Sequence, residues 1–477
     1  MIAAMLATSA LPVTPSAPQF DRALIERYEL NGPRYTSYPT APHFRTDFGE
    51  AEFRAAVRAS NEDPIPHPLS LYVHVPFCPS PCFYCGCTRI ITRDASKPVA
   101  YVDRLVREAS LLAPLFDRDR EVIQLHFGGG TPNVLDEPSF DYLMSALGHH
   151  FSLSHAPSRE FGIEVDPRLA TPGDIARFAR LGFNRLSLGI QDFDPDVQRA
   201  VNRVQGVAET QALLEAARAH GFRSTSVDLI YGLPLQTEQR FADTLDRVVA
   251  MRPGRIVTYA YAHLPERFPA QRRIDRHELP DAATRLGLLE LAVERLCAAG
   301  YVYIGMDHFA LPEDDLALAQ AAGTLQRNFQ GYSTHARTDL VALGMSSISH
   351  VGASFSQNAR DLKSYEAAID AGHLPVCRGL ALDADDLIRA DVIQQLMCND
   401  AVDVRRIESQ HRIDFASYFR EALDKLAEMA ADGLVSLSPT HIRVHARGRL
   451  LLRNVAMCFD RYLGRGLPAA LRYSKTV

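Results

Sequence analysis

The sequence has no uninterrupted apolar run of the roughly 18–20 residues that a membrane-spanning helix needs. It also has no large excess of one charge, because 51 Lys and Arg stand against 57 Asp and Glu in a chain of 477 residues. A net charge of −6, with both signs mixed along the chain, creates no field that would hold nucleic acid or an anionic membrane at long range. We therefore expect a protein that binds neither nucleic acid nor a membrane.

Basic residues are absent from the N-terminal stretch, M-I-A-A-M-L-A-T-S-A-L-P-V-T-P-S-A-P-Q-F. A secretory signal would place Lys or Arg before the short apolar patch that this stretch contains. We therefore expect residues 1–20 to form a disordered extension rather than a signal. The sequence contains no internal repeat beyond the alternation described below, and no low-complexity segment.

Cysteine is scarce outside one loop. Four of the eight cysteines lie between residues 78 and 87, whereas Cys297, Cys377, Cys398 and Cys458 are scattered through the rest of the chain. Cysteines placed in this way are typical of buried thiols in a reducing compartment rather than of a disulfide framework. We therefore expect a cytoplasmic protein.

The four clustered cysteines follow an apolar alternating run, Leu71–Phe77, that predicts a strand. Cys78, Cys82 and Cys85 have the spacing C-x3-C-x2-C, and Cys87 comes two residues later. A structural [4Fe–4S] cluster takes four cysteine ligands, so three closely spaced thiols leave one iron free to bind another group. A structural zinc loop is the alternative, although no second C-x2-C pair follows. Spacing alone leaves open whether Cys87 is a fourth ligand.

Strand-like runs alternate with helical patterns from Leu69 onward. The runs are Leu71–Phe77, Val122–Phe127, Phe161–Val165, Arg185–Ile190, Ser226–Tyr231, Ile256–Tyr261 and Tyr301–Met306. Such alternation predicts parallel strands joined by right-handed crossovers. Six or seven units are too few for a complete eightfold barrel, so we predict an α/β fold with an open, partial (β/α)6-like barrel of the TIM type.

Polar and glycine residues lie at or near the predicted ends of these strands, where barrels of this type carry their chemistry. They are Gly128-Gly129-Gly130-Thr131, Glu164, Asp166, Gln191, Asp228 and Ala262-His263. Any one of them alone is explained by ordinary structural hydrogen bonding. Together they predict one shared pocket.

The remaining segments predict two further parts around the barrel. Residues 21–65 contain N-G-P-R-Y-T-S-Y-P-T and are interpreted as a segment covering the pocket, with surface packing as the alternative. Residues 66–375 form the barrel, including a looser insertion at 313–360. Residues 376–477 predict a mostly helical domain in which three helices and a hairpin resemble a winged helix. Its arginines at 443, 447, 449 and 453 raise the alternative of DNA binding, which we do not expect.

The longer string around the cysteines, Y-V-H-V-P-F-C…C-F-Y-C-G-C, resembles radical S-adenosylmethionine (SAM) enzymes. Among them it resembles the oxygen-independent coproporphyrinogen III oxidase family. The likeness extends from about Tyr28 to Tyr462 and includes G-G-G-T-P, I-E-V-D-P-R, G-I-Q-D-F, N-F-Q-G-Y and M-C-F-D. A haem-trafficking relative that acts as a haem-binding chaperone is the alternative. That branch typically has Phe at the position of Cys87, which argues against it here.

The resemblance implies an oxidoreductase of haem biosynthesis that holds a [4Fe–4S] cluster on Cys78, Cys82 and Cys85 and uses two molecules of SAM. A 5′-deoxyadenosyl radical would convert two propionates of coproporphyrinogen III to vinyl groups, giving protoporphyrinogen IX. The electron donor and acceptor are not identified by the sequence. We expect a monomer, and the role of Cys87 and the proton-handling residues stay open.

The resemblance also implies which residues bind each SAM molecule. For the first molecule they are Tyr72, Gly129, Glu164 and Ile348. For the second molecule they are Tyr84, Gly130, Thr131, Gln191, Arg203, Asp228 and Ala262. A glycine-rich turn allows close backbone approach, and an arginine can pair with a carboxylate in a fork geometry. Arg34 and Arg337 are hypotheses for propionate binding, as is His308 for proton transfer.

Overall fold

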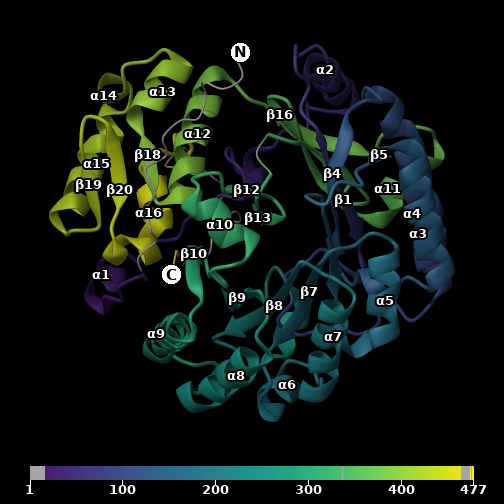
Figure 1. Ribbon diagram of the computed structural model, residues 1–477, viewed down its shortest axis with the longest axis horizontal. Helices are drawn as coiled ribbons and strands as arrows, with labels where there is room; N and C mark the ends of the chain where they lie inside the picture. The colour runs from purple at the N-terminus through teal and green to yellow at the C-terminus, as the bar shows by residue number, and fades with distance from the viewer. Residues whose placement is uncertain (1–16, 336, 464–472, 474, 477) are drawn as a thin grey trace. The chain divides into compact units, whose positions relative to one another are not determined.

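The computed structural model describes residues 17–335, 337–463, 473 and 475–476 (Figure 1). Contacts divide the chain into two compact units. The first unit contains Met1–Thr40, Leu296–Ala336 and Ile388–Val477, and the second contains Ala41–Arg295 and Arg337–Leu387. Most of the predicted extension at residues 1–20 lies outside the described residues, and the sequence-based domain boundaries at 65 and 375 remain predictions.

Six parallel strands form the centre of the second unit, in the order β9, β8, β7, β6, β4, β1. They are β1 (Leu69–Val75), β4 (Glu121–Gly129), β6 (Glu160–Val165), β7 (Arg185–Gln191), β8 (Ser224–Tyr231) and β9 (Arg255–Ala260). The helices that alternate with them are α3 (Ser96–Leu112), α4 (Glu137–His150), α5 (Pro172–Arg180), α6 (Pro195–Ala200), α7 (Val207–Ala219), α8 (Glu238–Met251) and α9 (Ala282–Ala298). Figure 1 shows α3, α4, α5, α7 and α8 along the outer side of the sheet. The predicted α/β alternation and partial barrel are confirmed.

The sheet continues beyond β1 in a way that the sequence did not predict. Strand β14 (Asp339–Leu343) pairs parallel with β1, and three antiparallel strands follow it: β15 (Ile348–Val351), β16 (Ser354–Asn358) and β17 (Val376–Ala381). The segment interpreted as a loose insertion therefore supplies sheet. The second unit also contains α2 (Glu50–Asn61), β2 (Phe77–Cys78), β3 (Ile90–Ile91), β5 (Ser152–Leu153) and α11 (Leu362–Asp370).

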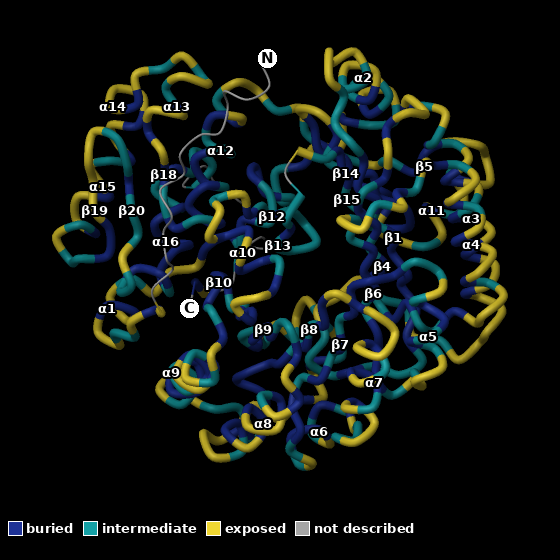
Figure 2. Tube along the Cα trace, viewed as in Figure 1, coloured by how far each residue is buried: buried dark blue, intermediate teal, exposed yellow. Residues whose placement is uncertain are grey.

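The core of the second unit lies between the sheet and its helices, where Figure 2 shows the strands buried and the outward faces of the helices exposed. Phe127 on β4 stacks against Phe140 on α4 with ring centroids 5.1 Å apart, and Phe140 lies 5.3 Å from Phe178 on α5. All three rings are fully buried. Burial of each such ring stabilises the fold by about 1.5–3 kcal/mol.

A buried polar network joins α3 to the end of β14. The carboxylate of Glu108 accepts hydrogen bonds from the Gly344 amide, the Asn358 side chain and the Tyr365 hydroxyl, each at 2.7 Å. Tyr101 on the same helix donates to the carbonyl of His74 at 3.0 Å. The helix is therefore tied both to the β14–β15 turn and to the end of β1, which leads to the cysteine loop.

The first unit is built around the predicted helical domain. Its helices are α1 (Arg22–Arg27), α10 (Asp315–Ala321), α12 (Ala384–Asn399, which begins in the second unit), α13 (Val404–His411), α14 (Phe415–Tyr418), α15 (Arg420–Ala431) and α16 (Leu452–Met457). A small sheet of β18 (Ala401–Asp403), β20 (His441–Val444) and β19 (Val435–Leu437) packs with them. The predicted sequence of helices, hairpin and final helix is confirmed.

Two short hairpins complete the first unit. One pairs β10 (Val302–Gly305) with β11 (His308–Ala310), and the other pairs β12 (Gln326–Asn328) with β13 (Gly331–Ser333). The run predicted as a seventh strand is thus β10, which pairs antiparallel with β11 instead of starting another parallel unit.

Two of the four arginines considered for DNA binding are buried inside the first unit. Arg449 donates to Asp400 and to the carbonyl of Tyr303, both at 2.8 Å. Arg453 donates to backbone carbonyls at the N-terminal segment, including that of Pro33 at 2.9 Å. Since these side chains are used within the fold, they are not available to phosphates.

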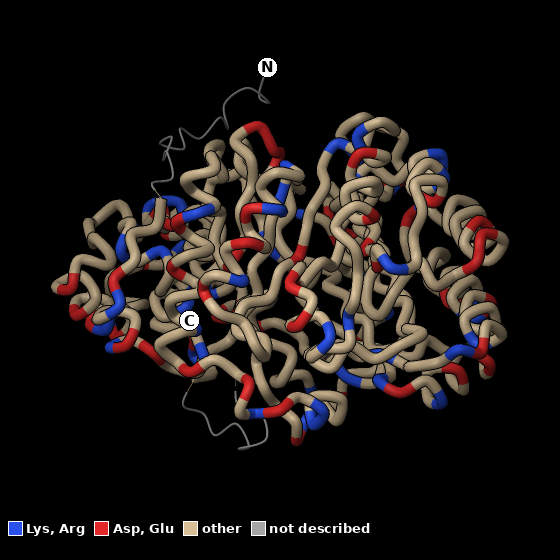
Figure 3. Tube along the Cα trace, turned by 90° about the horizontal axis from the view of Figure 1, so that it is seen from below, with Lys and Arg blue, Asp and Glu red and all other residues tan. Residues whose placement is uncertain are grey.

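Charged residues of both signs are interspersed along the chain trace (Figure 3). Among the described residues, no helix combines the length and the apolar character that crossing a membrane requires.

We predict that Glu108 makes stability depend on pH. Burial raises the pKa of Glu108 from 4.5 to about 7 even though three donors contact it. Between these pH values the folded chain binds more protons than the unfolded chain, so the free energy of unfolding falls as pH rises. Glu108→Gln removes this titration and loses one acceptor, which costs on the order of 1–3 kcal/mol.

The deficit of Glu108→Gln should be largest near pH 4.5 and shrink as pH approaches 7. Thermal unfolding of the variant and the unchanged chain across this range measures it. Glu121→Gln, at an exposed position, is the matched control. A deficit that does not vary with pH would contradict the prediction.

Candidate active site

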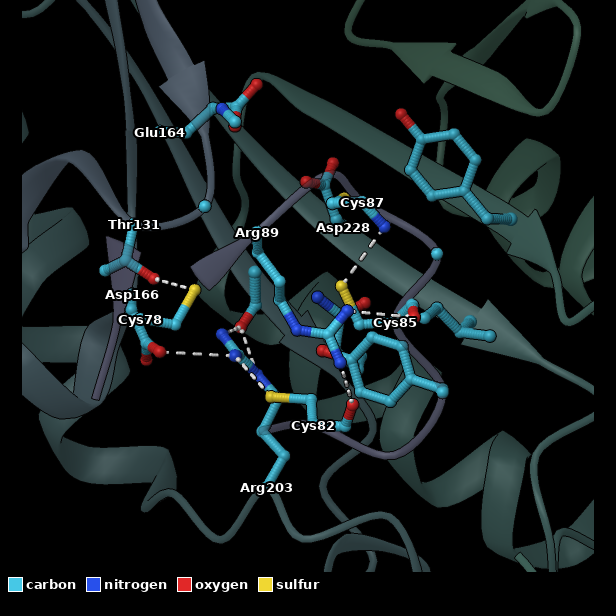
Figure 4. A pocket seen from close by; sticks show the side chains of 18 of the residues that line it. Cys78, Cys82, Cys85, Cys87, Arg89, Thr131, Glu164, Asp166, Arg203 and Asp228 are labelled. Atoms are coloured by element: carbon cyan, nitrogen blue, oxygen red, sulfur yellow. Dashed lines mark hydrogen bonds and ion pairs between the residues drawn. The ribbon is translucent and has the colours of Figure 1, made fainter. Parts of the chain in front are cut away.

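A pocket of about 460 Å³ lies in the second unit, where the cysteine loop meets the C-terminal ends of the parallel strands (Figure 4). The cysteine loop contributes Cys78, Cys82, Tyr84, Cys85, Cys87 and Arg89 to its lining. The strand ends and following loops contribute Gly129, Gly130, Thr131, Glu164, Asp166, Arg168, Ser187, Gly189, Gln191, Arg203, Asp228, Ala262 and Gln271. The expected strand-end groups therefore gather in one pocket, except Gly128 and His263, which do not line it.

The cysteine loop is held by a segment more than 100 residues away. The Phe83 amide donates to the Val201 carbonyl at 2.9 Å, and the Asn202 side chain donates to the Pro81 carbonyl at 2.7 Å. Asn202 has a φ of +55°, a backbone conformation that asparagine tolerates better than most residues. These bonds orient the middle of the loop from outside it.

Arg89 closes the loop from its other end. Its two terminal nitrogens donate to the carbonyls of Cys85 and Cys82 at 3.0 and 3.2 Å. One guanidinium therefore fixes the backbone of two of the three predicted ligands. Sequence reasoning did not assign a role to Arg89.

The sulfur of Cys82 lies beside two guanidiniums. Arg203 Nη1 is 3.5 Å and Arg168 Nη2 is 3.6 Å from its Sγ. Asp166 holds both arginines, since its carboxylate accepts from Arg168 at 2.6 Å and from Arg203 at 3.3 Å. Two guanidiniums therefore lie beside the sulfur of this predicted ligand.

The other two predicted ligands have different surroundings. The Cys78 thiol lies 3.2 Å from Thr131 Oγ1, and burial raises its pKa to about 11. A hydrogen bond from Cys87, helped by Arg89, lowers the pKa of Cys85 to about 6 and makes it a thiolate at neutral pH. The Cys87 amide also donates to the Cys85 sulfur at 3.4 Å.

The donor set fits a cluster of several irons better than a single ion. Among the described residues, no three His, Cys, Asp or Glu side chains converge as ligands of one metal ion must. Cys78, Cys82 and Cys85 nevertheless line one pocket. Thiolates spread around a common space are suited to a [4Fe–4S] cluster, whose irons take cysteine ligands.

The glycine turn after β4 leaves no room for side chains. A Cβ on Gly128 would lie 2.8 Å from the Glu164 carboxylate, and one on Gly130 would lie 2.7 Å from the backbone of Pro76. Gly129 has a φ of +113°, and a Cβ there would lie 2.5 Å from the His74 ring. The turn therefore brings bare backbone to the pocket, as a ligand contacted through peptide groups requires.

Glu164 is fixed against this turn by two hydrogen bonds. It accepts from the Gly129 amide at 3.2 Å and lies 3.1 Å from His126 Nε2. Burial acts to raise the pKa of Glu164, but these partners lower it overall and keep the carboxylate charged. Tyr72 stacks on His126 with ring centroids 6.0 Å apart. Tyr72 therefore packs on the far side of the histidine that contacts Glu164.

Asp228 faces the pocket from the middle of β8. Burial, followed by the nearby charge of Glu164, raises its pKa to about 7. Ser187 on β7 donates to it at 3.4 Å. Gln191, at the end of β7, has a φ of +70° beside a shift in strand register, which turns this residue out of the regular pleat.

Gln271 joins two predicted contact points that are distant in sequence. Its side-chain amide donates to the carbonyls of Tyr84 at 3.0 Å and of Ala262 at 3.1 Å, and the residue is almost fully buried. Sequence reasoning missed Gln271 because it lies in a short helical turn at Pro269–Arg273, away from any strand end. No local pattern would have identified it.

The structure brings together all three predicted cysteine ligands and nine of the eleven predicted SAM-binding residues. The nine are Tyr84, Gly129, Gly130, Thr131, Glu164, Gln191, Arg203, Asp228 and Ala262. Tyr72 and Ile348 do not line the pocket: Tyr72 stacks behind Glu164, and Ile348 begins β15, paired with Gln357. Their roles in binding remain predictions.

Comparisons with known proteins agree with this geometry. The sequence pattern of the Radical SAM superfamily matches residues 72–248, and that of the HemN C-terminal domain matches residues 382–451. The partial barrel and its three-thiol loop thus define a radical SAM enzyme, a class that uses a [4Fe–4S] cluster and SAM.

Relatives over nearly the whole chain identify the family. The oxygen-independent coproporphyrinogen III oxidase of Pseudomonas aeruginosa is 50% identical over 93% of this chain and 96% of its own. That of Escherichia coli is 48% identical over 93% and 96%. The solved structure described as coproporphyrinogen III oxidase (HemN) from Escherichia coli has a TM-score of 0.89, 47% identity and coverage of 94% and 100%. The chain belongs to the oxygen-independent coproporphyrinogen III oxidase family.

We predict that Cys78, Cys82 and Cys85 bind the cluster and that Cys87 does not. Changing Cys78, Cys82 or Cys85 to Ser should abolish the visible absorbance of a thiolate-ligated Fe–S cluster. Cys87→Ser, the matched control from the same loop, should keep the absorbance. Iron and sulfide analysis after anaerobic reconstitution measures both. Loss of the cluster in Cys87→Ser would make Cys87 a ligand instead.

Proposed function

We propose that the chain catalyses the oxygen-independent conversion of two propionate side chains of coproporphyrinogen III to vinyl groups, giving protoporphyrinogen IX in haem biosynthesis. The observation that carries this proposal is the three-thiol loop opening onto a pocket lined by the glycine turn and charged strand ends. Family membership supports the substrate, because the relatives are named for it.

The pocket residues divide into two groups that would hold the cofactors. Cys78, Cys82 and Cys85 would bind the cluster, with Gly129 and Glu164 placed for the amino acid end of a SAM molecule at its open iron. When bound, the cluster and SAM supply a 5′-deoxyadenosyl radical that removes a hydrogen atom from the β-carbon of a propionate. The substrate then loses carbon dioxide and passes one electron to an acceptor.

A second SAM molecule is part of the proposal. Arg203 is buried and holds its guanidinium on Gly189, Asp166 and Cys82, so it would present a fixed charge to a carboxylate. Asp228, ionised or protonated near neutral pH, would bond ribose hydroxyls. Gln271 would support the main-chain contacts of Tyr84 and Ala262.

The pocket's own side chains would shape the electrostatics of the cluster. Guanidinium N–H groups directed at Cys82 lie within 3.6 Å of its sulfur, and hydrogen bonds to cluster sulfurs are one of the influences on reduction potential. Asp166 would keep both arginines in that position. We propose that the chain works as a cytoplasmic monomer with a separate electron donor and acceptor, and binds neither nucleic acid nor a membrane.

A haem-binding chaperone is the second candidate function within the same class of fold. Cys87 and the charged pair Arg203 and Asp228 argue for the oxidase. The two functions differ in one product, because only the oxidase releases carbon dioxide from coproporphyrinogen III.

We predict carbon dioxide release and 5′-deoxyadenosine formation when anaerobically reconstituted protein is reduced and given SAM and coproporphyrinogen III. Arg203→Ala should retain the cluster but lower turnover at least about tenfold, since a charge-assisted hydrogen bond to a charged group contributes roughly 1.5–3 kcal/mol. Arg199→Ala is the matched control: this arginine is exposed and pairs with Asp196.

Cluster content and product formation are measured on the same samples. Reconstituted protein with an intact cluster that releases no carbon dioxide would refute the oxidase function. Unchanged turnover in Arg203→Ala would remove Arg203 from the site. Loss of turnover in both arginine variants would show a general effect of removing positive charge.

A further inference from the structure

The hairpin of β12 and β13 in the first unit, part of which carries N-F-Q-G-Y, contains buried donors without acceptors. Arg327 is only 9% exposed, and its Nε and Nη1 atoms have no hydrogen-bond partner. Gln330 Nε2, at the turn of the same hairpin, also has none. Across the hairpin, Tyr332 lies under the Arg327 guanidinium, 4.7 Å from ring centroid to carbon.

Burying these donors without acceptors destabilises the folded chain unless a ligand supplies the acceptors. A buried polar group without a partner loses the hydrogen bonds that water gave it, and a buried charge loses more. The unpartnered atoms of Arg327 and Gln330 are all nitrogens. A completing ligand must therefore bring acceptor oxygens, and the guanidinium favours an anion.

The charges around Arg327 point the same way. Asp307 forms an ion pair with Arg34 at 3.5 Å. Burial raises the pKa of Asp307, and the positive charges of Arg34, Arg453 and Arg327 oppose that rise, so one carboxylate serves three guanidiniums. Burial, then the charge of Arg34, lowers the pKa of Arg453 to about 10, as expected where positive charge is in excess.

The neighbouring arginines show that Arg327 is different. Arg453 donates to the carbonyls of Gly32, Pro33 and Thr476, and so has its acceptors within the fold. Tyr332 donates to the Met397 carbonyl at 2.8 Å, which fixes the ring on which Arg327 packs. The Arg327 guanidinium thus packs on the Tyr332 ring, with its Nε and Nη1 unused.

We propose that Arg327, aided by Gln330, is a binding site for a carboxylate, and that this carboxylate is a propionate of the tetrapyrrole substrate. The choice of propionate rests on the function proposed above. A planar guanidinium fixed on an aromatic face matches a carboxylate in a bidentate fork. Neither residue was identified from the sequence, where Arg34 and Arg337 were the hypotheses for propionate binding.

The first test is binding of coproporphyrin III, the oxidised and unreactive tetracarboxylate, to the full-length protein with its cluster, followed by fluorescence. Arg327→Gln should weaken binding about tenfold or more, because it loses charge-assisted bonds. Arg327→Lys, which keeps the charge but not the fork, should also weaken it. Arg405→Gln, at an exposed position of the same unit, should not.

Two other probes identify the group that is bound. Etioporphyrin, a porphyrin without carboxylates, should bind the unchanged protein and Arg327→Gln equally. Inorganic phosphate should not compete with coproporphyrin III at Arg327. Unchanged affinity of Arg327→Gln for coproporphyrin III, or a site that binds phosphate but not the porphyrin, would overturn the proposal.

A stability measurement separates a binding role from a structural one. If the buried guanidinium awaits a ligand, then without porphyrin Arg327→Gln should have a thermal midpoint equal to or above that of the unchanged chain. If Arg327 serves only to pack on Tyr332, the midpoint should fall while porphyrin affinity stays the same, which refutes the proposal.

Gln330→Glu provides a variant that keeps Arg327 intact. The new carboxylate on the hairpin would offer acceptors to the unused nitrogens and repel a ligand carboxylate, so porphyrin binding should again weaken. Binding as tight as in the unchanged protein would count against the site.

The binding results are independent of whether the chain is an oxidase. Should the unchanged protein release no carbon dioxide, the proposed function fails while the porphyrin titration still decides the role of Arg327. Should the unchanged protein be active and Arg327→Gln show the same KM for coproporphyrinogen III, only the carboxylate site fails.

Discussion

The active pocket depends on one buried carboxylate, that of Asp166, which holds Arg168 and Arg203 beside the sulfur of Cys82. The thiol loop itself is short and largely irregular, so it cannot set its own geometry. Its position is determined by donors from the ends of β6 and α6, strand and helix ends that the parallel sheet brings to one edge. The Cys82 sulfur and the two guanidiniums are thereby placed before any cofactor binds, which lowers the reorganisation that binding requires.

The glycine turn constrains the pocket in a second way, because it has no room for side chains. Around Gly129 the neighbouring atoms of His74, Glu164 and Pro76 already fill every position that a side chain would occupy. The tight fit extends outward, because His74 is tied through its carbonyl to Tyr101, and Glu108 on the same helix is tied to the β14–β15 turn. The pocket wall is therefore joined by hydrogen bonds to the core behind it.

Much of this was predictable from the sequence, for identifiable reasons. Strands β4 and β8 are rich in apolar residues, and the polar or glycine residues of the pocket lie within or at the ends of both, so fold and pocket follow largely from local pattern. Gln271 was not predictable, since its role comes from the distance between two carbonyls that only the tertiary structure brings together. Strands β14 to β16 were missed because each has at most five residues, and because the partner of β14 is β1, which is distant in the sequence. Ile348 lies in β15 and does not line the pocket, so its role in binding stays a prediction.

Buried arginines in this chain fall into two kinds. Arg449 and Arg453 direct their nitrogens at a carboxylate or at carbonyls supplied by the fold, and such groups stabilise the structure that satisfies them. Arg327 has a comparable burial and an aromatic ring beneath it, yet its Nε and Nη1 lack acceptors. Natural folds satisfy most buried polar groups, so an exception of this kind costs stability that folding alone does not return. A ligand that supplies the missing acceptors restores this stability when it binds. An unsatisfied guanidinium packed on a ring therefore indicates a binding site more strongly than a satisfied one does.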